Sequence, residues 1–320
     1  MNLGLPEVII SFQTAAQTAV QRSQQGVVAL ILRDDTVTTF TTKTYNTIDD
    51  VAKTDWTDTN YNLISKTFLG TPSKVIVVRG GTTDTDYTQQ LTTLATMRWN
   101  YMAIPGIASD DVSAVSTWLI GQRAAPNSRT FKAVLPNSPS DNEGIINFAT
   151  EGIVVEDTTY TASQYTGRIA GILAGLPQTR SATYYVLSEV DSITPSADPD
   201  SDVDAGKLIL INDGEKVKIA RGVNSLVTLT GKSADWQKIK IIDGHDLVQD
   251  DIRNTFNDEY VGKVNNDYDN QAIFIAAVNQ YWGYSARSKC DKYRRRQHRS
   301  PASSMARRRH GYEQLERPAG

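Results

Sequence analysis

Between residues 27 and 177, short apolar runs alternate with longer amphipathic segments. Strand–helix alternation at this spacing is typical of a mostly parallel sheet covered by helices. Asp110 is placed to cap the last of the helices. The pattern therefore predicts an α/β fold for this region. The predicted buried strands are residues 27–32, 74–78, 100–104 and 130–135, and the predicted helices are residues 49–69, 85–98 and 110–123.

A stripe of glycines marks another predicted helix, at residues 163–175. Gly167, Gly171 and Gly175 stand four residues apart, so they share one face of that helix. Each glycine costs a helix about 1 kcal/mol relative to alanine. Close approach of another backbone is the usual compensation. The stripe therefore predicts tight packing against another part of the fold.

Two hairpins are predicted around and after this helix. Residues 142–161 contain two short strand candidates, which predict a hairpin around Thr150–Gly152. Residues 206–220 predict a second hairpin, because Asp213-Gly214 is a tight-turn signal between two strand-like runs. The acidic residues 194–205, with two prolines, predict an exposed loop that leads into the second hairpin.

The region that follows mixes strands and helices. Residues 238–242 alternate between polar and apolar side chains and predict a strand. Asp243 and Asp246 are placed to cap the helix after it. Further along, residues 273–281 predict another helix. The apolar face of the first helix is expected to contain Leu247, Val248, Ile252, Phe256, Tyr260 and Val264.

The first 25 residues are expected to form an arm. Val8, Ile9, Ile10, Ser11 and Phe12 form a short strand candidate, and the polar residues 13–25 separate it from the first core strand. Such a strand can fold back on its own chain, or it can pair with an open sheet edge of a neighbour. The residues alone leave both alternatives open.

Charge is distributed unevenly along the chain. Residues 283–320 contain 11 Lys/Arg and 3 Asp/Glu, a net charge of +8, which leaves a net charge of −11 for residues 1–282. This last stretch has no Val, Ile or Phe and a single Leu, so it cannot bury enough apolar surface to offset its ordering entropy. One interpretation is a basic arm for nucleic acid or another anionic surface.

No pattern for catalysis, metal or cofactor binding is complete. The aspartates of residues 198–204 lack the glycine and glutamate of a calcium loop. Gly231-Lys232-Ser233 lacks the first glycine of a phosphate loop, and Gly80-Gly81 lacks a third glycine for a dinucleotide site. No apolar run approaches the roughly 20 residues of a membrane span. Cys290 is single, which excludes an internal disulfide.

Several long blocks resemble the sheath protein of contractile phage tails. The most similar are KLILINDGEKVKIARGVNSL (residues 207–226), DWQKIKIIDGHDLVQDDIRNTF (235–256) and YVGKVNNDYDNQAIFIAAV (260–278). Further matching blocks are LPEVIISF, RSQQGVVALIL, NEGIINFATEGIVV and YTGRIAGILAGLPQTRSATY. The resemblance covers residues 5–282 and looks strongest to the compact sheaths of phage-tail-like bacteriocins and defective prophages of Gram-positive bacteria.

The resemblance implies a structural protein that is not an enzyme. Copies are expected to form hexameric rings, stacked in a helical assembly around a tail tube, that contract to drive the tube through the target envelope. The expected partners are the chain itself, the tail tube protein, the baseplate and the tail terminator, with no cofactor and no nucleic acid. The expected location is the virion or a phage-tail-like particle, assembled in the cytoplasm of the bacterial host.

The resemblance also implies a division of the chain. Residues 1–25 are expected to be the N-terminal arm, with Val8–Phe12 exchanged between subunits. Residues 26–178 are expected to form the α/β sheath domain, described in this family as subtilisin-like, and residues 179–282 a smaller α+β C-terminal domain. Residues 283–320 do not continue the family pattern. We interpret this abrupt loss as a disordered tail or a change of reading frame.

Two further expectations concern contacts and a rival function. Candidate contacts to the tube or to neighbouring subunits are the basic residues Lys216, Lys218, Lys238, Lys240 and Arg253. The alternative to a sheath is an α/β nucleotide-binding or enzymatic module with a basic nucleic-acid arm. That alternative predicts a deep pocket with convergent polar groups at the carboxyl ends of the parallel strands. His245 is the only histidine before residue 283, and a helix-capping or surface role is expected for it.

Overall fold

The computed structural model describes residues 26–279 and residue 281. These residues divide between two compact units, and the division falls between Asp251 and Ile252. The predicted inter-subunit strand Val8–Phe12 and the basic stretch 283–320 lie outside the described residues.

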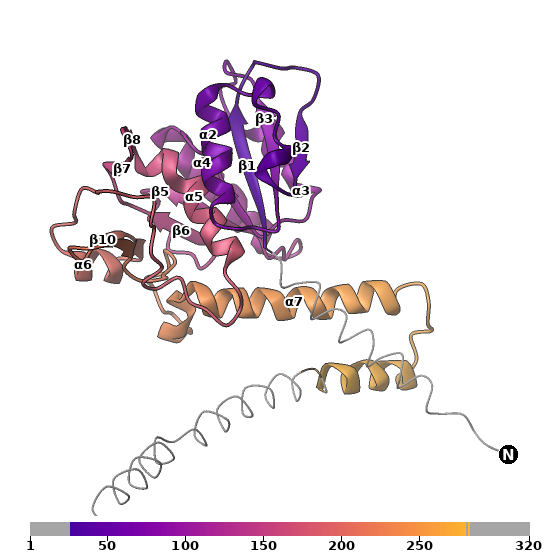
Figure 1. Ribbon diagram of the computed structural model, residues 1–320. Coiled ribbons are helices and arrows are strands. Elements are labelled where there is room, and N and C mark those ends of the chain that lie inside the picture. Colours follow the sequence, from indigo (N-terminus) through magenta and orange to yellow (C-terminus); the bar gives the residue numbers. More distant parts are fainter. Residues whose placement is uncertain (1–25, 280, 282–320) are drawn as a thin grey trace, which may run out of the picture. The chain divides into compact units, whose positions relative to one another are not determined.

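A seven-stranded sheet forms the centre of the first unit (Figure 1). Six of its strands run parallel, and the edge strand β2 is antiparallel to its neighbour β3. The predicted α/β fold with a mostly parallel sheet is therefore confirmed. The order across the sheet is β2 (Thr42–Tyr45), β3 (Lys74–Gly80), β1 (Val27–Arg33), β4 (Tyr101–Ala103), β5 (Lys132–Pro136), β6 (Ile145–Phe148) and β9 (Lys207–Leu208).

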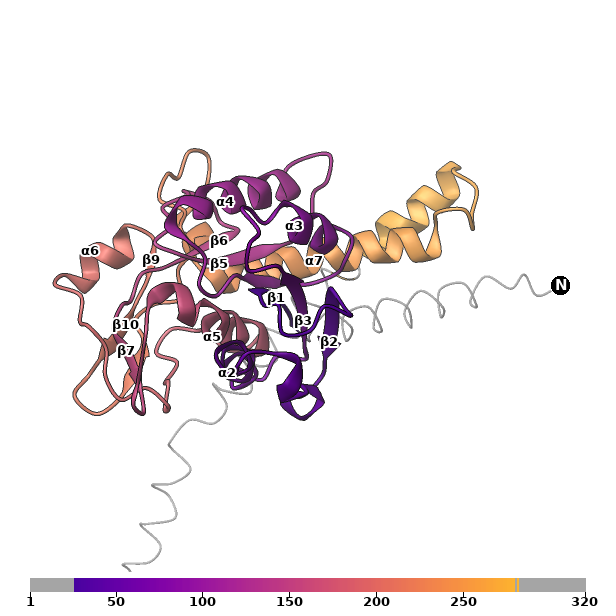
Figure 2. The ribbon, with the colours of Figure 1, turned by 90° about the horizontal axis from the view of Figure 1, so that it is seen from above.

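Helices cover both faces of this sheet. In strand β1, Val28, Leu30 and Leu32 belong to one buried cluster, whereas Ala29 and Ile31 belong to the other. This alternation follows from the two-residue period of a strand. Figure 2 shows one pair of helices on each side of the sheet. The first cluster packs on α2 (Asp58–Phe68) and α5 (Ala162–Gly175), and the second on α3 (Thr88–Ala95) and α4 (Ser109–Arg123).

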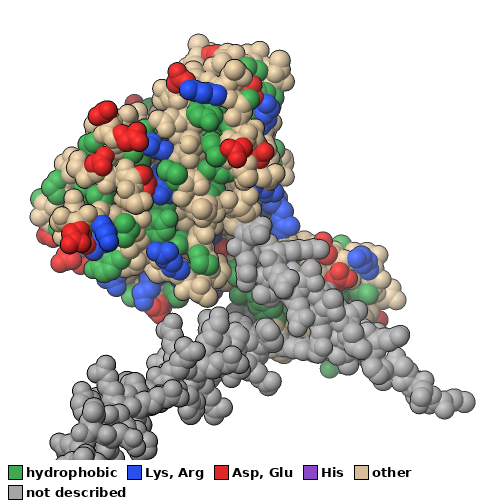
Figure 3. All heavy atoms as spheres, in the orientation of Figure 1, with side chains coloured by type: hydrophobic (Ala, Val, Ile, Leu, Met, Phe, Trp, Pro, Cys, Tyr) green, Lys and Arg blue, Asp and Glu red, His purple; other side chains and the backbone are tan. Residues whose placement is uncertain are grey.

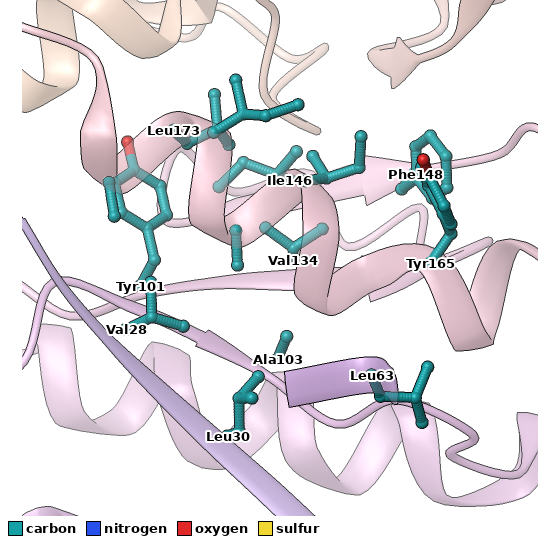
Figure 4. Packing of buried hydrophobic residues seen from close by; sticks show 14 of the residues in the cluster. Val28, Leu30, Leu63, Tyr101, Ala103, Val134, Ile146, Phe148, Tyr165 and Leu173 are labelled. Carbon is teal, nitrogen blue, oxygen red and sulfur yellow. The ribbon is translucent and has the colours of Figure 1, made fainter. Parts of the chain in front are cut away.

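Helix α5 is the most deeply buried helix of this unit. Its Tyr165 and Leu173 side chains pack on sheet residues that include Val134, Ile146 and Phe148 (Figure 4). The predicted glycine stripe makes this depth possible. A Cβ on Gly171 would lie 2.1 Å from the Thr67 carbonyl oxygen of α2, and one on Gly175 would lie 1.9 Å from the Gly70 carbonyl oxygen. The predicted backbone approach is confirmed, and α2 is the partner.

The smaller hairpins differ in part from the prediction. Strand β6 does not turn back at Thr150–Gly152; it joins the main sheet, and the hairpin forms one step later between β7 (Ile153–Val155) and β8 (Thr158–Tyr160). The reason is that all four residues of β6 are buried, as expected of an internal strand. The predicted turn at Gly214 is confirmed, with φ of 95° between β10 (Leu210–Asn212) and β11 (Val217–Ile219).

Two helix predictions and one loop prediction were also wrong in detail. The helix expected over residues 49–69 begins only at Asp58, after the short 3₁₀ turns η1 (Ile48–Asp50) and η2 (Lys53–Asp55). The loop expected at residues 194–205 contains a short helix, α6 (Pro199–Asp204), which Asp198 caps by accepting a hydrogen bond from the Ser201 amide. The residue that precedes α4 is Ala108, so Asp110 lies inside the helix and does not cap it.

The strand predicted at residues 238–242 is the start of a helix. Helix α7 (Ile239–Glu259) follows the 3₁₀ turn η3 (Ala234–Gln237). Its buried residues Ile239, Ile242 and Asp246 are spaced by three and four, which is the period of a helix. Residues 238–242, which alternate between Lys and Ile, also fit that period, because Ile239 and Ile242 are three residues apart and lie on one helical face. Asp243 and Asp246 therefore lie within α7 and are not caps.

The second unit contains the end of α7 and a helix over residues 268–279. The two are joined by a turn in which Gly262 has a φ of 73°. Phe274 packs on Phe256 and Tyr260, with ring centroids 5.2 and 4.9 Å apart. This aromatic contact holds the two helices of the hairpin together.

Candidate functional site

A groove of about 660 Å³ opens at the carboxyl ends of β4 and β5, where the rival enzyme function predicts a pocket. Of the described residues that line it, Glu151 alone carries a titratable carboxyl, imidazole or amine. Both Glu151 oxygens are occupied, because Oε2 accepts from the Ala162 amide at 3.0 Å and Oε1 from Asn137 at 3.4 Å. The Ser116 and Ser140 hydroxyls hydrogen-bond each other at 2.6 Å. The hydroxyls of the groove thus bond to each other, and Glu151 bonds to the Ala162 amide and the Asn137 side chain.

His245 lies away from that groove, on the surface of α7. Its ring stacks on Trp236 with centroids 4.8 Å apart. This agrees with the surface role expected from the sequence. The described part of the chain therefore brings no Ser-His-Asp arrangement together.

Residues that resembled ligand loops are engaged in structural contacts. Lys232 forms an ion pair with Glu143 at 3.0 Å. The Gly81 amide donates to the Asp84 carboxylate at 2.9 Å. In the acidic segment, Asp202 pairs with Lys207 at 2.7 Å. Among the described residues, no group of three or more His, Cys, Asp and Glu could hold a metal ion. None of the helices described is long and apolar enough to cross a membrane.

The predicted basic contact residues are only partly available to a partner. Lys218 pairs with Asp213 at 2.5 Å, and Lys238 pairs with Asp235 at 2.7 Å. Lys240 donates to the Pro177 carbonyl oxygen at 3.2 Å and to Gln178 at 3.0 Å. Partial burial lowers the pKa of Lys240. On the face seen in Figure 3, basic side chains are spread among acidic ones and form no single patch.

The other two basic candidates, Lys216 and Arg253, lie elsewhere in the chain. Lys216 is exposed beside the β10–β11 turn, where its backbone amide donates to Asp213. Arg253 is half-buried on α7 in the second unit. The structure therefore does not bring the five candidates together as one site.

The helical hairpin of the second unit exposes an unusual amount of apolar surface. The exposed fractions are 57% for Val261, 59% for Ile275 and 82% for Tyr268. Isolated exposed apolar residues are common, but several on one small element mark an interaction surface. The sequence periodicity placed Phe256 and Val264 on the apolar face of a helix, and the structure leaves both of them exposed. The exposed residues are Phe256, Val261, Val264, Tyr268, Ile273 and Ile275.

A buried ion cluster at the amino-terminal edge of the sheet was missed by the sequence reasoning. Lys132, the first residue of β5, lies 3.2 Å from Asp243 and 2.7 Å from Asp246 of α7. Arg123 donates through both terminal nitrogens to Asp246, at 3.2 and 3.0 Å. Tyr101 donates to Asp243 at 2.5 Å. A lysine inside an apolar run was the available signal, because burying its charge requires a partner.

Charge and burial oppose each other in this cluster. Burial raises the pKa of Tyr101, and the negative charge of Asp243 adds to that rise. For Asp246, burial acts to raise the pKa, yet the Lys132 and Arg123 charges overcome it and leave the pKa below its usual value. The same carboxylates leave the pKa of Lys132 above its usual value despite burial. Lys132 and Asp246 are therefore charged at neutral pH.

Family models and sequence relatives give a consistent identification. The phage tail sheath protein central domain matches residues 80–225, and the phage tail sheath C-terminal domain matches residues 231–283. The tail sheath protein of Clostridium phage phiCD119 is 38% identical over 291 residues, which cover 87% of this chain and 79% of the relative. The phage-like element PBSX protein XkdK of Bacillus subtilis is 29% identical over 188 residues, covering 55% of this chain and 40% of that protein.

Solved sheath structures share the fold. The sheath tail protein Lin1278 from Listeria innocua superposes with a TM-score of 0.69 at 18% identity, over 87% of this chain and 88% of that one. The helical sheath of the anti-feeding prophage in its contracted state gives 0.65 at 12% identity, over 82% and 78%. The resemblance seen in the sequence is confirmed: this chain belongs to the phage tail sheath protein family.

Proposed function

We propose that this chain polymerises into hexameric rings that stack around a tail tube, and that contraction of this sheath drives the tube through a target envelope. The observation that carries the proposal is the 38% identity to a phage tail sheath protein over 87% of the chain. The similar fold of the anti-feeding prophage sheath, a helical assembly in its contracted state, supports it. A related structure of that particle is a baseplate, which makes a baseplate a proposed partner as well.

In this proposal, neighbouring subunits are joined by the N-terminal arm. Strand β1 lies between β3 and β4, so neither of its sides is open to the residues that precede it. The described chain begins at Gly26, whose carbonyl oxygen accepts from the Ser73 amide at 3.0 Å. The segment Val8–Phe12 would then add to a sheet edge of a neighbouring copy, where backbone hydrogen bonds supply affinity. Residues 13–25 would turn while those hydrogen bonds persist.

The exposed apolar hairpin supplies the second proposed contact. Val261, Val264 and Ile275 are exposed there, and assembly would remove them from water. Burial of apolar surface contributes about 25 cal/mol per Å², so a larger interface in the contracted state would favour contraction. Contraction would then use conformational energy stored during assembly, without a nucleotide. We also propose that the chain contacts the tail tube protein and the tail terminator.

The five basic candidate residues are proposed to contact a neighbouring subunit or the tube, but they differ in how readily they can do so. Lys216, which is exposed, would meet acidic groups of a neighbour or of the tube, and Arg253 would contact a neighbour from the second unit. Lys218, Lys238 and Lys240 would first have to leave the partners they already bind. Because surface ion pairs contribute only about 0–1 kcal/mol each, these contacts would set register more than affinity. We also propose assembly in the bacterial host cytoplasm.

Deleting residues 1–12 tests the exchanged arm. The truncated chain is expected to remain folded, because the deleted residues precede Gly26 and the sheet. It is expected to remain monomeric, because the strand that joins neighbours is absent. Circular dichroism would check the fold, and sedimentation with negative-stain electron microscopy would check assembly.

Deleting residues 1–4 alone is the matched control, since it shortens the arm but keeps Val8–Phe12. That variant is expected to assemble to the same extent as the full chain. Sheath tubes of normal length from the 1–12 deletion would contradict the proposal. Loss of assembly in both variants would show that arm length, and not the strand, matters.

A further inference from the structure

The inner face of α7 is polar where most buried helices are apolar. Asp243, Asp246 and Asp250 follow one another at spacings of three and four, so they share one face. All three accept hydrogen bonds from the amino-terminal edge of the sheet or from the residues just before it. Asp243 and Asp246 bind Lys132, and Asp250 accepts from Thr130 at 2.7 Å. Polar contacts therefore hold α7 along this stretch.

The comparison with α5 shows how different this attachment is. From Ala162 to Gly175, α5 buries eleven residues, most of them small or apolar. In α7 up to residue 251, the buried apolar side chains are Ile239 and Ile242, both in the first turn, while Leu247 and Val248 are half-buried. Beyond Ile242, release of α7 would expose little apolar surface. The hydrophobic cost of such a release is small.

Space for water adjoins the same contacts. A cavity of about 50 Å³ is lined by Lys132, Asp243, Asp246 and Asp250, together with Asn100 and Tyr101. A polar cavity of this size can hold water. Water that enters there can solvate the charges as α7 separates. This lowers the penalty that otherwise traps a buried ion pair.

We propose that residues 243–251 of α7 form a strap, latched to the amino-terminal edge of the sheet by the Lys132 cluster and able to release while the sheet stays folded. Lys132 is the centre of the latch, because its side chain is only 3% exposed and contacts two carboxylates of the strap. The strap is a property of the single subunit and does not depend on assembly.

The charges around Lys132 fix the conditions under which the latch is closed. The strap contributes Asp243, Asp246 and Asp250, and the turn of α7 before it contributes Lys240. The sheet contributes Tyr101 and Lys132, and α4 contributes Arg123. The charge of Arg123 also helps to lower the pKa of Glu143.

Linkage gives the direction of the pH effect. The pKa of Asp246 is lowered from 3.8, so its contribution is present above that value and is lost as pH falls through the lower, folded value. The pKa of Lys132 is raised from 10.5, so its contribution is present below that value and is lost above it. The latch is therefore closed from about pH 4 to about pH 10.

Hydrogen exchange of the full chain, followed by mass spectrometry, tests the strap. At pH 7, peptides from residues 243–251 are expected to exchange faster than peptides from α5, because the strap opens without the sheet. Lys132→Met is expected to accelerate exchange of the strap on the order of a hundredfold, the lower end of what removing one partner of a buried ion pair causes. Exchange of α5 is expected to change less than about threefold. Below pH 4, corrected for intrinsic rates, the wild-type strap is expected to lose protection before α5 does.

A second variant separates charge from packing. Lys132→Met combined with Asp243→Asn removes one charge of each sign and leaves the Arg123–Asp246 pair in place. This variant is expected to restore strap protection to within about tenfold of the wild type. Exchange of the strap only together with α5, equal acceleration of both by Lys132→Met, or no restoration in the double variant would each overturn the proposal.

Discussion

Single glycines decide how closely α2 and α5 approach each other. Gly171 lies against the Thr67 carbonyl oxygen, where even a methyl group has no room. Gly121, in α4, is also helical, but nothing lies within 4 Å of the position its Cβ would take. The same residue type therefore has opposite consequences at the two positions.

The two glycines form a matched pair for a stability measurement. Gly171→Ala is expected to lower the free energy of unfolding by about 1–3 kcal/mol or more, because the helices must move apart. Gly121→Ala is expected to raise it by about 0.5–1 kcal/mol through helix propensity. Urea denaturation followed by circular dichroism measures both. A neutral Gly171→Ala would show that the α2–α5 contact is loose.

At the scale of elements, one carboxylate joins the end of β1 to the start of α2. Asp34 is buried and accepts from the Thr57 amide at 2.9 Å and from the Asn60 side chain at 2.7 Å. Burial acts to raise its pKa, but the hydrogen bonds from Thr57, Asn60 and Thr36 together bring the pKa well below its usual value. The neighbouring Asp35 is exposed.

Removing this carboxylate gives a prediction that depends on pH. Asp34→Ala is expected to lower the free energy of unfolding at pH 7 by about 1–3 kcal/mol, because several donors lose their acceptor. The contribution is present above about pH 4 and is lost as pH falls further, so the variant and wild type should converge in acid. Urea titrations at pH 7 and pH 3 measure this, with Asp35→Ala as the control. A difference that stays constant with pH would contradict the role of the charge.

At the scale of the whole molecule, the C-terminal family match ends at residue 283, where the sequence pattern also stops. Residues 283–320 carry 11 Lys/Arg and do not continue the family pattern. From the resemblance we expect this chain to polymerise poorly, because residues 283–320 do not match the stretch with which a sheath protein is expected to complete its inter-subunit contacts. Electron microscopy of the purified chain measures tube formation, and wild-type-like tubes would count against this expectation.

The gene offers a separate check on the same segment. If the stretch results from a change of reading frame, one of the other two frames is expected to encode a family-like continuation after codon 282. A chain carrying that continuation is then expected to assemble into longer tubes than the chain that carries residues 283–320. Absence of such a continuation from both frames would refute the frame change.

Much of the fold could be predicted because its signals are local. The apolar runs at Val27 and Lys74 became internal parallel strands, and the stripe from Gly167 to Gly175 correctly indicated a backbone contact. The errors occurred where a short pattern fits two periods. Residues 238–242 alternate like a strand, yet Ile239 and Ile242 also share a helical face. A window of five residues does not distinguish the two.

The sequence by itself determined the family, the parallel sheet and its covering helices. Apolar periodicity and long matching blocks are local signals, which can be recognised from residues that are close together in the sequence. Only the tertiary structure decided which charges meet. Lys132 and Asp246 are 114 positions apart, and the sequence around either residue does not indicate that the other is its partner. Burial and pairing depend on contacts that form only when distant segments pack, and this is why the sheet was predictable and the ion cluster was not.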